Sequence, residues 1–118
     1  MSPDGTFWNQ EVETLPREDL EEIQTNLLKD LVQRAWDNSP FYRDLYRKAG
    51  VVPSDIQSLA DVKHLPFTDK YVLQHAYPYG HLMVPWSEVR EFHSATTPTR
   101  HMFPIFETEK DIARWGER

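Results

Sequence analysis

Residues 16–50, with the sequence PREDLEEIQTNLLKDLVQRAWDNSPFYRDLYRKAG, decide the fold because they carry two helical patterns separated by one stop signal. Pro16 suits a first helical turn, and the acidic pair after Arg17 suits the positive end of a helix dipole. Apolar residues then recur at helical spacing, namely Leu20, Ile23, Leu27, Leu31 and Ala35. This pattern predicts a helix over residues 17–36. A second row widens its apolar stripe, so we expect packing from two sides; that row is Leu28, Val32 and Trp36.

The sequence DNSP at residues 37–40 ends the first helix and starts a second one. Ser39 suits the N-cap, Pro40 the first helical position and Gly50 the C-terminal stop. One face of the second helix is apolar and largely aromatic, with Phe41, Tyr42, Leu45, Tyr46 and Ala49. We therefore predict an antiparallel helical hairpin, in which this face meets the leucine-rich stripe of the first helix.

Shorter elements flank the two helices. Residues 1–13 are polar apart from a few side chains that include the aromatic pair Phe7 and Trp8. This pattern predicts an extended arm that packs through these two aromatic rings. After the second helix, residues 54–64 predict two single helical turns, at 54–59 and 60–64.

Local signals continue along the middle of the chain. Ser58 and Asp61 have the spacing of a capping pair, and Thr68 is expected to cap a helix over residues 69–76. The sequence YPYG at residues 77–80 predicts a turn. We expect the tyrosines of this region to pack against the aromatic face of the second long helix; they are Tyr71, Tyr77 and Tyr79.

The last third of the chain changes from helical to extended patterns. Residues 89–95 alternate apolar and polar side chains, as a strand does, and residues 101–106 form a second extended segment. A final helix is expected from about Glu109. The predicted fold class is therefore mainly α with a small β hairpin (α+β).

The length of 118 residues fits one domain. We divide that domain into a helical part (residues 1–86), a strand–loop–strand part (87–107) and a C-terminal helix (108–118).

Composition excludes several function classes. The net charge of −6 disfavours nucleic acid and anionic membrane surfaces as partners, and no apolar run approaches the length of a membrane span. The chain has no cysteine, which excludes disulfides and thiolate metal sites. The start of the chain lacks the basic segment of a signal peptide, so the cytoplasm is the expected location.

The segment between the two predicted strands, SATTPT at residues 94–99, is the candidate site. A loop rich in hydroxyls between strands can present hydroxyl and backbone N–H groups to a phosphate. The candidate phosphate ligands are Ser94, Thr96, Thr97 and Thr99. Phosphate loops use glycine to bring the backbone close to the anion and commonly carry a lysine, and this loop has neither. An inert hairpin is the alternative, and the missing glycines favour it.

Other titratable residues give no sign of a catalytic or metal site. No two histidines are spaced i, i+4 beside a carboxylate within the predicted helices, so we predict no metal site; the five are His64, His75, His81, His93 and His101. The acidic residues Asp19, Glu21 and Glu22 lie where a helix dipole favours them. No residue is predicted to be catalytic.

Six short motifs occur in a fixed order along the chain: WN at 8–9, ETLPRE at 13–18, NSPFYR at 38–43, AGV at 49–51, LPFTDK at 65–70 and YPYG at 77–80. In this order and spacing the set resembles the N-terminal part of phenylacetate–coenzyme A ligases, which are adenylate-forming enzymes. The resemblance covers nearly the whole chain but only about the first quarter of such a ligase. It implies the N-terminal helical subdomain of that fold.

The resemblance also implies an activity and its ligands. Such ligases use ATP and magnesium to activate an aryl carboxylic acid and then transfer it to coenzyme A. In the family the segment that matches His93 onward has the sequence HASSGTTGKPT and wraps the phosphates of ATP. Residues 94–99 therefore take the position of that loop by resemblance.

This chain departs from the family loop in either of two alignments. Without a gap, Thr97 and Arg100 replace glycines and His101 replaces the lysine. With a gap, Ala95 replaces one glycine and a Gly-Lys pair is missing. A non-glycine residue held at positive φ costs about 1–2 kcal/mol, and the lost lysine removes a contact worth about 1.5–3 kcal/mol. We expect weak ATP binding through this loop.

Two hypotheses follow. In the first hypothesis, the chain is a piece of an acyl-coenzyme A ligase. It works with a partner chain or segment that carries the family's other motifs, and it is inactive alone. In the second, it is a non-catalytic interaction or oligomerisation module that keeps part of the fold. In both, we expect exposed apolar residues of the hairpin to drive homo-oligomer formation; they are Phe92, Phe103, Ile105 and Phe106.

Overall fold

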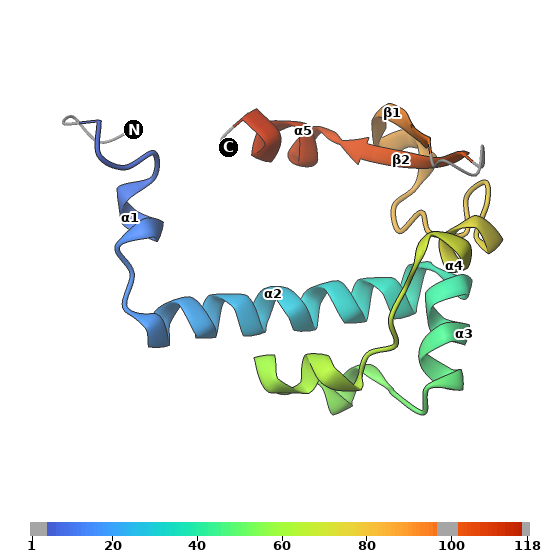
Figure 1. Ribbon diagram of the computed structural model, residues 1–118, viewed down its shortest axis with the longest axis horizontal. Helices are drawn as coiled ribbons and strands as arrows, with labels where there is room; N and C mark the ends of the chain where they lie inside the picture. Colours follow the sequence, from blue (N-terminus) through green and yellow to red (C-terminus); the bar gives the residue numbers. More distant parts are fainter. Residues whose placement is uncertain (1–4, 97–101, 117–118) are drawn as a thin grey trace.

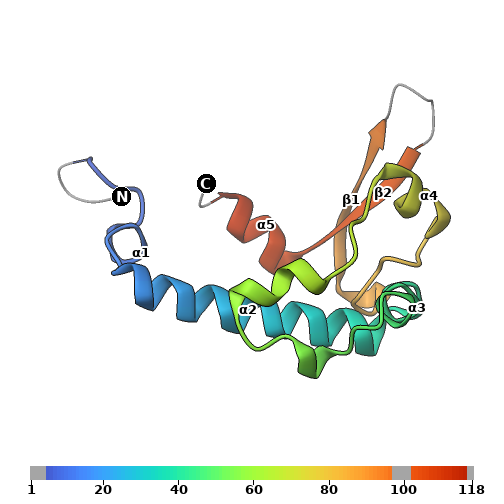
Figure 2. The same ribbon diagram turned by 60° about the horizontal axis from the view of Figure 1, so that its bottom comes forward.

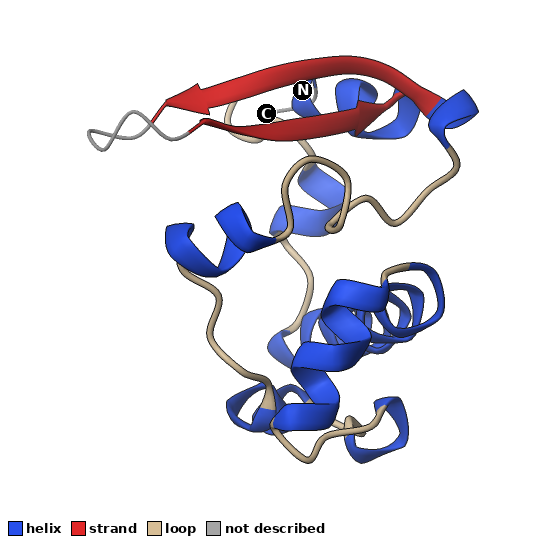
Figure 3. Ribbon diagram, turned by 90° about the vertical axis from the view of Figure 1, so that its right-hand side faces the viewer, coloured by secondary structure: helices blue, strands red, loops and turns tan. Residues whose placement is uncertain are grey.

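The computed structural model describes residues 5–96 and 102–116, with side chains for residues 5–94 and 104–116. Over these residues the chain is mainly helical with one two-stranded antiparallel sheet, which confirms the predicted fold class (Figures 1 and 3). The α-helices are α1 (Gln10–Glu13), α2 (Arg17–Asn38), α3 (Pro40–Lys48), α4 (Lys70–His75) and α5 (Glu109–Gly116). Short 3-10 helices are η1 (Pro53–Asp55), η2 (Leu59–His64) and η3 (Trp86–Glu88), and the strands are β1 (Val89–Thr96) and β2 (Met102–Thr108).

Helices α2 and α3 lie across one another. Figure 1 shows α2 lengthwise with α3 turned across its C-terminal end, and Figure 2 shows α3 end-on while α2 still lies lengthwise. The predicted antiparallel hairpin is therefore wrong, although both helices form. The reason is the connection: Ser39 alone separates the two helices, whereas an antiparallel pair is joined by a loop of about 2–5 residues.

Ser39 fixes the corner between α2 and α3. It is fully buried, its Oγ accepts a hydrogen bond from the Tyr42 N–H at 3.2 Å, and its hydroxyl donates to the Gly80 carbonyl at 2.6 Å. The first bond is the predicted N-cap. The second hydrogen bond joins the corner between α2 and α3 to Gly80, in the turn after α4.

Gly50 follows α3 with φ of 72°, a conformation that glycine adopts without a steric penalty.

The hydrophobic core lies where α2, α3 and the segment around η1 meet. Its buried members are Val32, Ala35, Tyr46, Val51 and Ile56. Partly buried residues pack around them, namely Leu28, Trp36, Tyr42, Leu65 and Met83. Burial raises the pKa of the Tyr42 and Tyr46 hydroxyls, because loss of water disfavours the charged form.

The core takes only Ala35 from the main predicted stripe of α2 and leaves the middle of that stripe exposed. Ile23, Leu27 and Leu31 are 44%, 54% and 50% exposed, whereas Val32 and Ala35 are buried. All three residues of the second row belong to the core or pack against it, namely Leu28, Val32 and Trp36, so that row makes most of the core contact of α2. Ile23, Leu27 and Leu31 of the first row lie on a face that the described chain leaves largely uncovered.

Several local predictions hold and others need correction. Ser58 and Asp61 form the predicted capping pair at η2, and backbone N–H groups of Gln57 and Ser58 hold the Asp61 pKa below its usual range. Helix α4 forms, but Asp69 rather than Thr68 caps it, because the Asp69 carboxylate accepts from two α4 N–H groups.

The N-terminal arm and the tyrosines also differ from expectation. The arm contains the short helix α1, whose first turn is capped by Asn9, and Trp8 is exposed. Tyr71, Tyr77 and Tyr79 are each more than half exposed and do not belong to the core. Tyr79 contacts the Trp86 and Phe106 rings, so its predicted packing against the aromatic face of α3 needs correction.

Aromatic residues attach the hairpin to the helical part. The Phe106 ring on β2 lies 5.9 Å from the Tyr79 ring and 5.6 Å from the Trp86 ring, measured between centroids. The His81 Nε2–H donates to the Pro104 carbonyl at 2.6 Å. Phe106 is therefore covered on one side, contrary to the expectation that it lacks neighbours. In the described part of the chain, no helix is both long and apolar enough to cross a membrane.

Candidate functional site

The candidate phosphate ligands sit at one end of the β hairpin. Strand β1 pairs antiparallel with β2, with Ser94 opposite Pro104 and Thr96 opposite Met102. Ser94 is exposed, so its hydroxyl is open to a ligand. Thr96 is the last residue of β1, while Thr97 and Thr99 lie outside the described residues. The structure thus puts two of the four predicted residues at the end of a strand and does not describe the other two.

The hairpin rises from the level of α2, and α4 lies beside β2 toward its far end (Figure 2). The His81–Pro104 hydrogen bond joins β2 to the segment after α4 at the position opposite Ser94. The opposite end is anchored, because β2 runs directly into α5 and the aromatic contacts of Phe106 lie near that end. Residues 94–96 therefore lie at the far end of β1, paired with the part of β2 that the segment 70–81 contacts.

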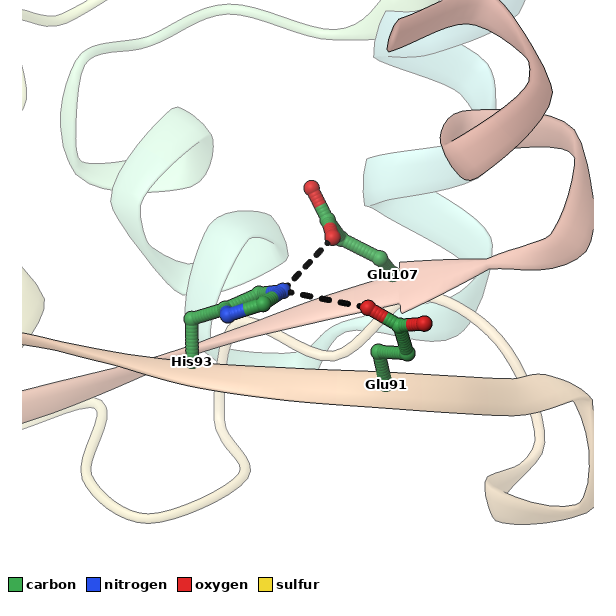
Figure 4. A group of neighbouring side chains, drawn as sticks. All are labelled: Glu91, His93 and Glu107. Atoms are coloured by element: carbon green, nitrogen blue, oxygen red, sulfur yellow. Dashed lines mark hydrogen bonds and ion pairs between the residues drawn. The ribbon is translucent and has the colours of Figure 1, made fainter. Parts of the chain in front are cut away.

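A cluster of charged side chains lies on one face of the hairpin (Figure 4). Glu91 and His93 are two positions apart on β1, and Glu107 is opposite Glu91 on β2. Alternation along a strand places all three side chains on the same face. His93 Nε2 lies 3.0 Å from Glu107 Oε2 and 3.5 Å from Glu91 Oε2. We call these three residues the hairpin triad.

The members of the hairpin triad differ in exposure. The Glu107 side chain is 13% exposed, whereas those of Glu91 and His93 are 56% and 57% exposed. An imidazole nitrogen and two carboxylate oxygens form a donor set that can bind a proton or a metal cation. Histidine spacing in helices does not reveal the triad, because its residues lie on two strands. The signal was a Glu-x-His alternation on β1, with an acidic residue on the neighbouring strand.

A groove of about 550 Å³ lies between the C-terminal half of α2, the segment around η3 and the start of α5. Its charged lining residues are Arg34, Glu88, Arg90, Glu109, Lys110, Asp111 and Arg114. Four positive and three negative side chains nearly balance, so the groove has no strong preference for an anion.

Asp111 in this groove serves to start α5. Its carboxylate accepts from the Thr108 N–H at 2.9 Å, and its own N–H donates to the Thr108 Oγ1 at 3.3 Å. This reciprocal pair is a capping box. The bond from the Thr108 N–H lowers the Asp111 pKa, and the charges of Arg114 and Arg34 add smaller effects in the same direction.

Comparison with known proteins gives one consistent set of relatives. The chain is 37% identical over 111 residues to a phenylacetate–coenzyme A ligase of Thermus thermophilus, a match that covers 94% of this chain and 25% of the relative. Ligases of the same name from Aromatoleum evansii and Escherichia coli are 35% and 33% identical over 105 residues. Each of these two matches covers 89% of this chain and 24% of the relative. No protein-family model matches the chain.

Solved structures agree with the sequence relatives. A 2-hydroxyisobutyryl-CoA ligase in complex with 2-HIB-AMP and CoA superposes with a TM-score of 0.83 at 27% identity, covering 94% of this chain and 24% of that chain. The same ligase in a postadenylation state with 2-HIB-AMP gives a TM-score of 0.81 at 28% identity. The chain spans about a quarter of the length of the proteins it matches.

Proposed function

We propose that this chain, a homologue of about a quarter of a phenylacetate–coenzyme A ligase, contributes one wall of an ATP-dependent acyl-coenzyme A ligase and has no activity without the rest of that fold. ATP, magnesium and coenzyme A are ligands of the assembled enzyme. In this proposal Ser94, Thr96, Thr97 and Thr99 face the ATP phosphates, as their position in the family implies. The observation that carries the proposal is the structural match, which extends over 94% of the chain.

The uncovered face of α2 supports the need for further fold. Ile23, Leu27 and Leu31 form an apolar row at i, i+4 and i+8, and each is close to half exposed. An apolar row of this length on a helix normally packs against another element. The solved ligases that match this chain contain about three times as much additional chain. That additional fold, on the same polypeptide or another, is the proposed cover.

The loop sequence limits what the chain contributes to catalysis. The Ser94 hydroxyl is exposed and fits a phosphate contact. Residues 94–99 contain no glycine and no lysine, so backbone approach and charge neutralisation are both weaker than in the family loop. A ligase site is assembled from several segments, and positioning by one of them cannot replace the others.

The first test of this proposal is complementation. Alone, the chain should give no ATP–pyrophosphate exchange with phenylacetate and only weak ATP binding by calorimetry. Mixed or co-expressed with the complementary three quarters of the Thermus thermophilus ligase, it should form a complex and restore measurable exchange, because the two parts together make the whole fold. Micromolar ATP binding by the chain alone would contradict the proposal, and so would failure to form any complex.

A second candidate function is a non-catalytic oligomerisation module, favoured by the exposed apolar residues of the hairpin. Phe92 and Ile105 are 67% and 43% exposed and lie on opposite faces of a two-stranded sheet whose described strands are both edges. A two-stranded sheet is marginal by itself in water, and a symmetric dimer would pair its edges or cover its faces. The Phe103 side chain, included in the sequence prediction, lies outside the described residues.

We expect the isolated chain to associate through these residues. Light scattering at micromolar concentration should give a mass above the 14.0 kDa of one chain. Phe92→Lys or Ile105→Lys should lower that mass, and the more effective variant identifies the face in contact. Val62→Lys, at an exposed apolar residue on η2, is the matched control and should leave the mass unchanged. A monomeric wild-type chain would exclude the module.

A further inference from the structure

We propose that the hairpin triad of Glu91, His93 and Glu107 is a binding site for a first-row divalent metal ion, with Zn2+ as the preferred ion. The triad offers one imidazole nitrogen and two carboxylate oxygens, and the three donor atoms lie within 4.8 Å of one another. All three are established types of zinc ligand. This site is independent of the proposed phosphate contacts, which involve other residues.

The distances agree with a metal site of ordinary size. Zinc bonds of about 2.0–2.2 Å in a tetrahedral arrangement place neighbouring ligand atoms about 3.3–3.6 Å apart. His93 Nε2 lies 3.0 Å from one carboxylate oxygen and 3.5 Å from the other. The three donor atoms lie within 4.8 Å of one another, and the exposed Glu91 side chain is free to rotate until they occupy three corners of the tetrahedron. A water molecule would take the fourth.

The charge arrangement gives a second, independent reason. Glu91 and Glu107 are directly opposite on neighbouring strands, and like charges in that position destabilise a sheet. Glu107 is also largely buried, which adds to the cost of its charge. Among the described residues, the ion pairs of both carboxylates are with His93, which supplies at most one positive charge. A divalent ion neutralises both carboxylates at once.

The donor set also selects among metals. Magnesium and calcium favour all-oxygen coordination with six or more ligands, whereas an imidazole nitrogen suits zinc and its first-row neighbours. Magnesium that accompanies ATP therefore has little affinity for the triad. A bound ion would cross-link β1 to β2 and fix the register of the hairpin that carries Ser94 and Thr96.

Calorimetric titration of Zn2+ into the metal-free full chain tests the site. We expect one saturable site per chain that an excess of Mg2+ does not displace. Glu91→Gln, His93→Gln and Glu107→Gln should each weaken Zn2+ binding by at least about tenfold, because even loss of a group that only supports a metal ligand costs that much. Glutamine has the shape of glutamate, and the His93 side chain is more than half exposed, so all three variants should keep the far-ultraviolet circular dichroism of the wild type.

Two matched controls and a spectroscopic probe complete the design. His75→Gln and Glu88→Gln remove the same residue types outside the triad and should leave Zn2+ affinity unchanged. Co2+ in place of Zn2+ should give the visible absorption bands of tetrahedral cobalt, and His93→Gln should abolish them. The proposal is overturned if no saturable binding occurs, if Mg2+ displaces Zn2+, or if His93→Gln binds Zn2+ as tightly as the wild type.

Discussion

Replacing Ile56 by alanine should lower the free energy of unfolding by about 2–5 kcal/mol, a large share of the total for a domain of this size. Ile56 is fully buried and packs in one cluster with Val32, Ala35, Tyr46 and Val51. Truncation leaves a cavity at the point where the segment after α3 closes over α2. Urea denaturation followed by circular dichroism measures the change.

Leu27→Ala is the matched control for this prediction. It removes the same number of carbon atoms from a side chain that is 54% exposed. We expect a loss of less than about 1 kcal/mol, because most of the leucine surface is already in contact with water. If Leu27→Ala destabilises the isolated chain as much as Ile56→Ala, the core has been placed on the wrong face of α2.

The two variants also report on the rest of the ligase fold. If the proposed cover packs on α2, Leu27 becomes buried in the complex with the complementary ligase segment. Leu27→Ala should then weaken that complex, although it barely affects the chain alone. Ile56→Ala should act mainly on the stability of the chain itself, because Ile56 is already enclosed.

Local signals in the sequence predicted most of the elements, because caps and turns depend on a few neighbouring residues. The Ser39 cap, the Gly50 stop, the Ser58–Asp61 pair and the start of α5 near Glu109 all occur as expected. The Asp69 cap was misassigned by one residue, because two adjacent residues can both accept from helix N–H groups.

The face of α2 that forms the core could not be predicted in the same way. Two adjacent apolar rows satisfy the helical period, and the choice between them depends on where the segment after α3 returns. Ile56 was missed for the same reason, since it lies in a short segment with no periodicity of its own. Only the folded chain brings it to Val32.

The two candidate sites were predictable to different degrees. The assignment of residues 94–99 to a phosphate loop rests on motif order and a family resemblance and stays a prediction, while the structure places Ser94 and Thr96 at the end of β1. The hairpin triad depends on strand register, because Glu107 meets Glu91 only if the chain reverses at the right length. Neither strand alone carries enough donor atoms to suggest a site.

The loop itself can be tested in a hybrid enzyme. In such a hybrid this chain replaces the matching quarter of the Thermus thermophilus ligase, so that every other part of the site is present. We expect adenylation of phenylacetate, measured by ATP–pyrophosphate exchange, to be far slower than in the parent. A charge-assisted contact of about 1.5–3 kcal/mol corresponds to a rate factor of about 10–150. The missing glycines add to this loss, because they weaken backbone approach to the phosphate.

Restoring the family loop should recover the rate. The variant combines Ala95→Gly with a Gly-Lys insertion between Thr97 and Pro98, which gives the segment SGTTGKPT. We expect an increase of at least about tenfold over the unmodified hybrid, because the lysine ammonium again neutralises phosphate charge. A Gly-Gln insertion with the same Ala95→Gly change restores loop length and glycine but no charge, and should recover only part of the rate. If the lysine and glutamine insertions perform equally, the charge has no role at this position. If the unmodified hybrid matches the parent ligase, residues 94–99 are a competent phosphate loop as they stand.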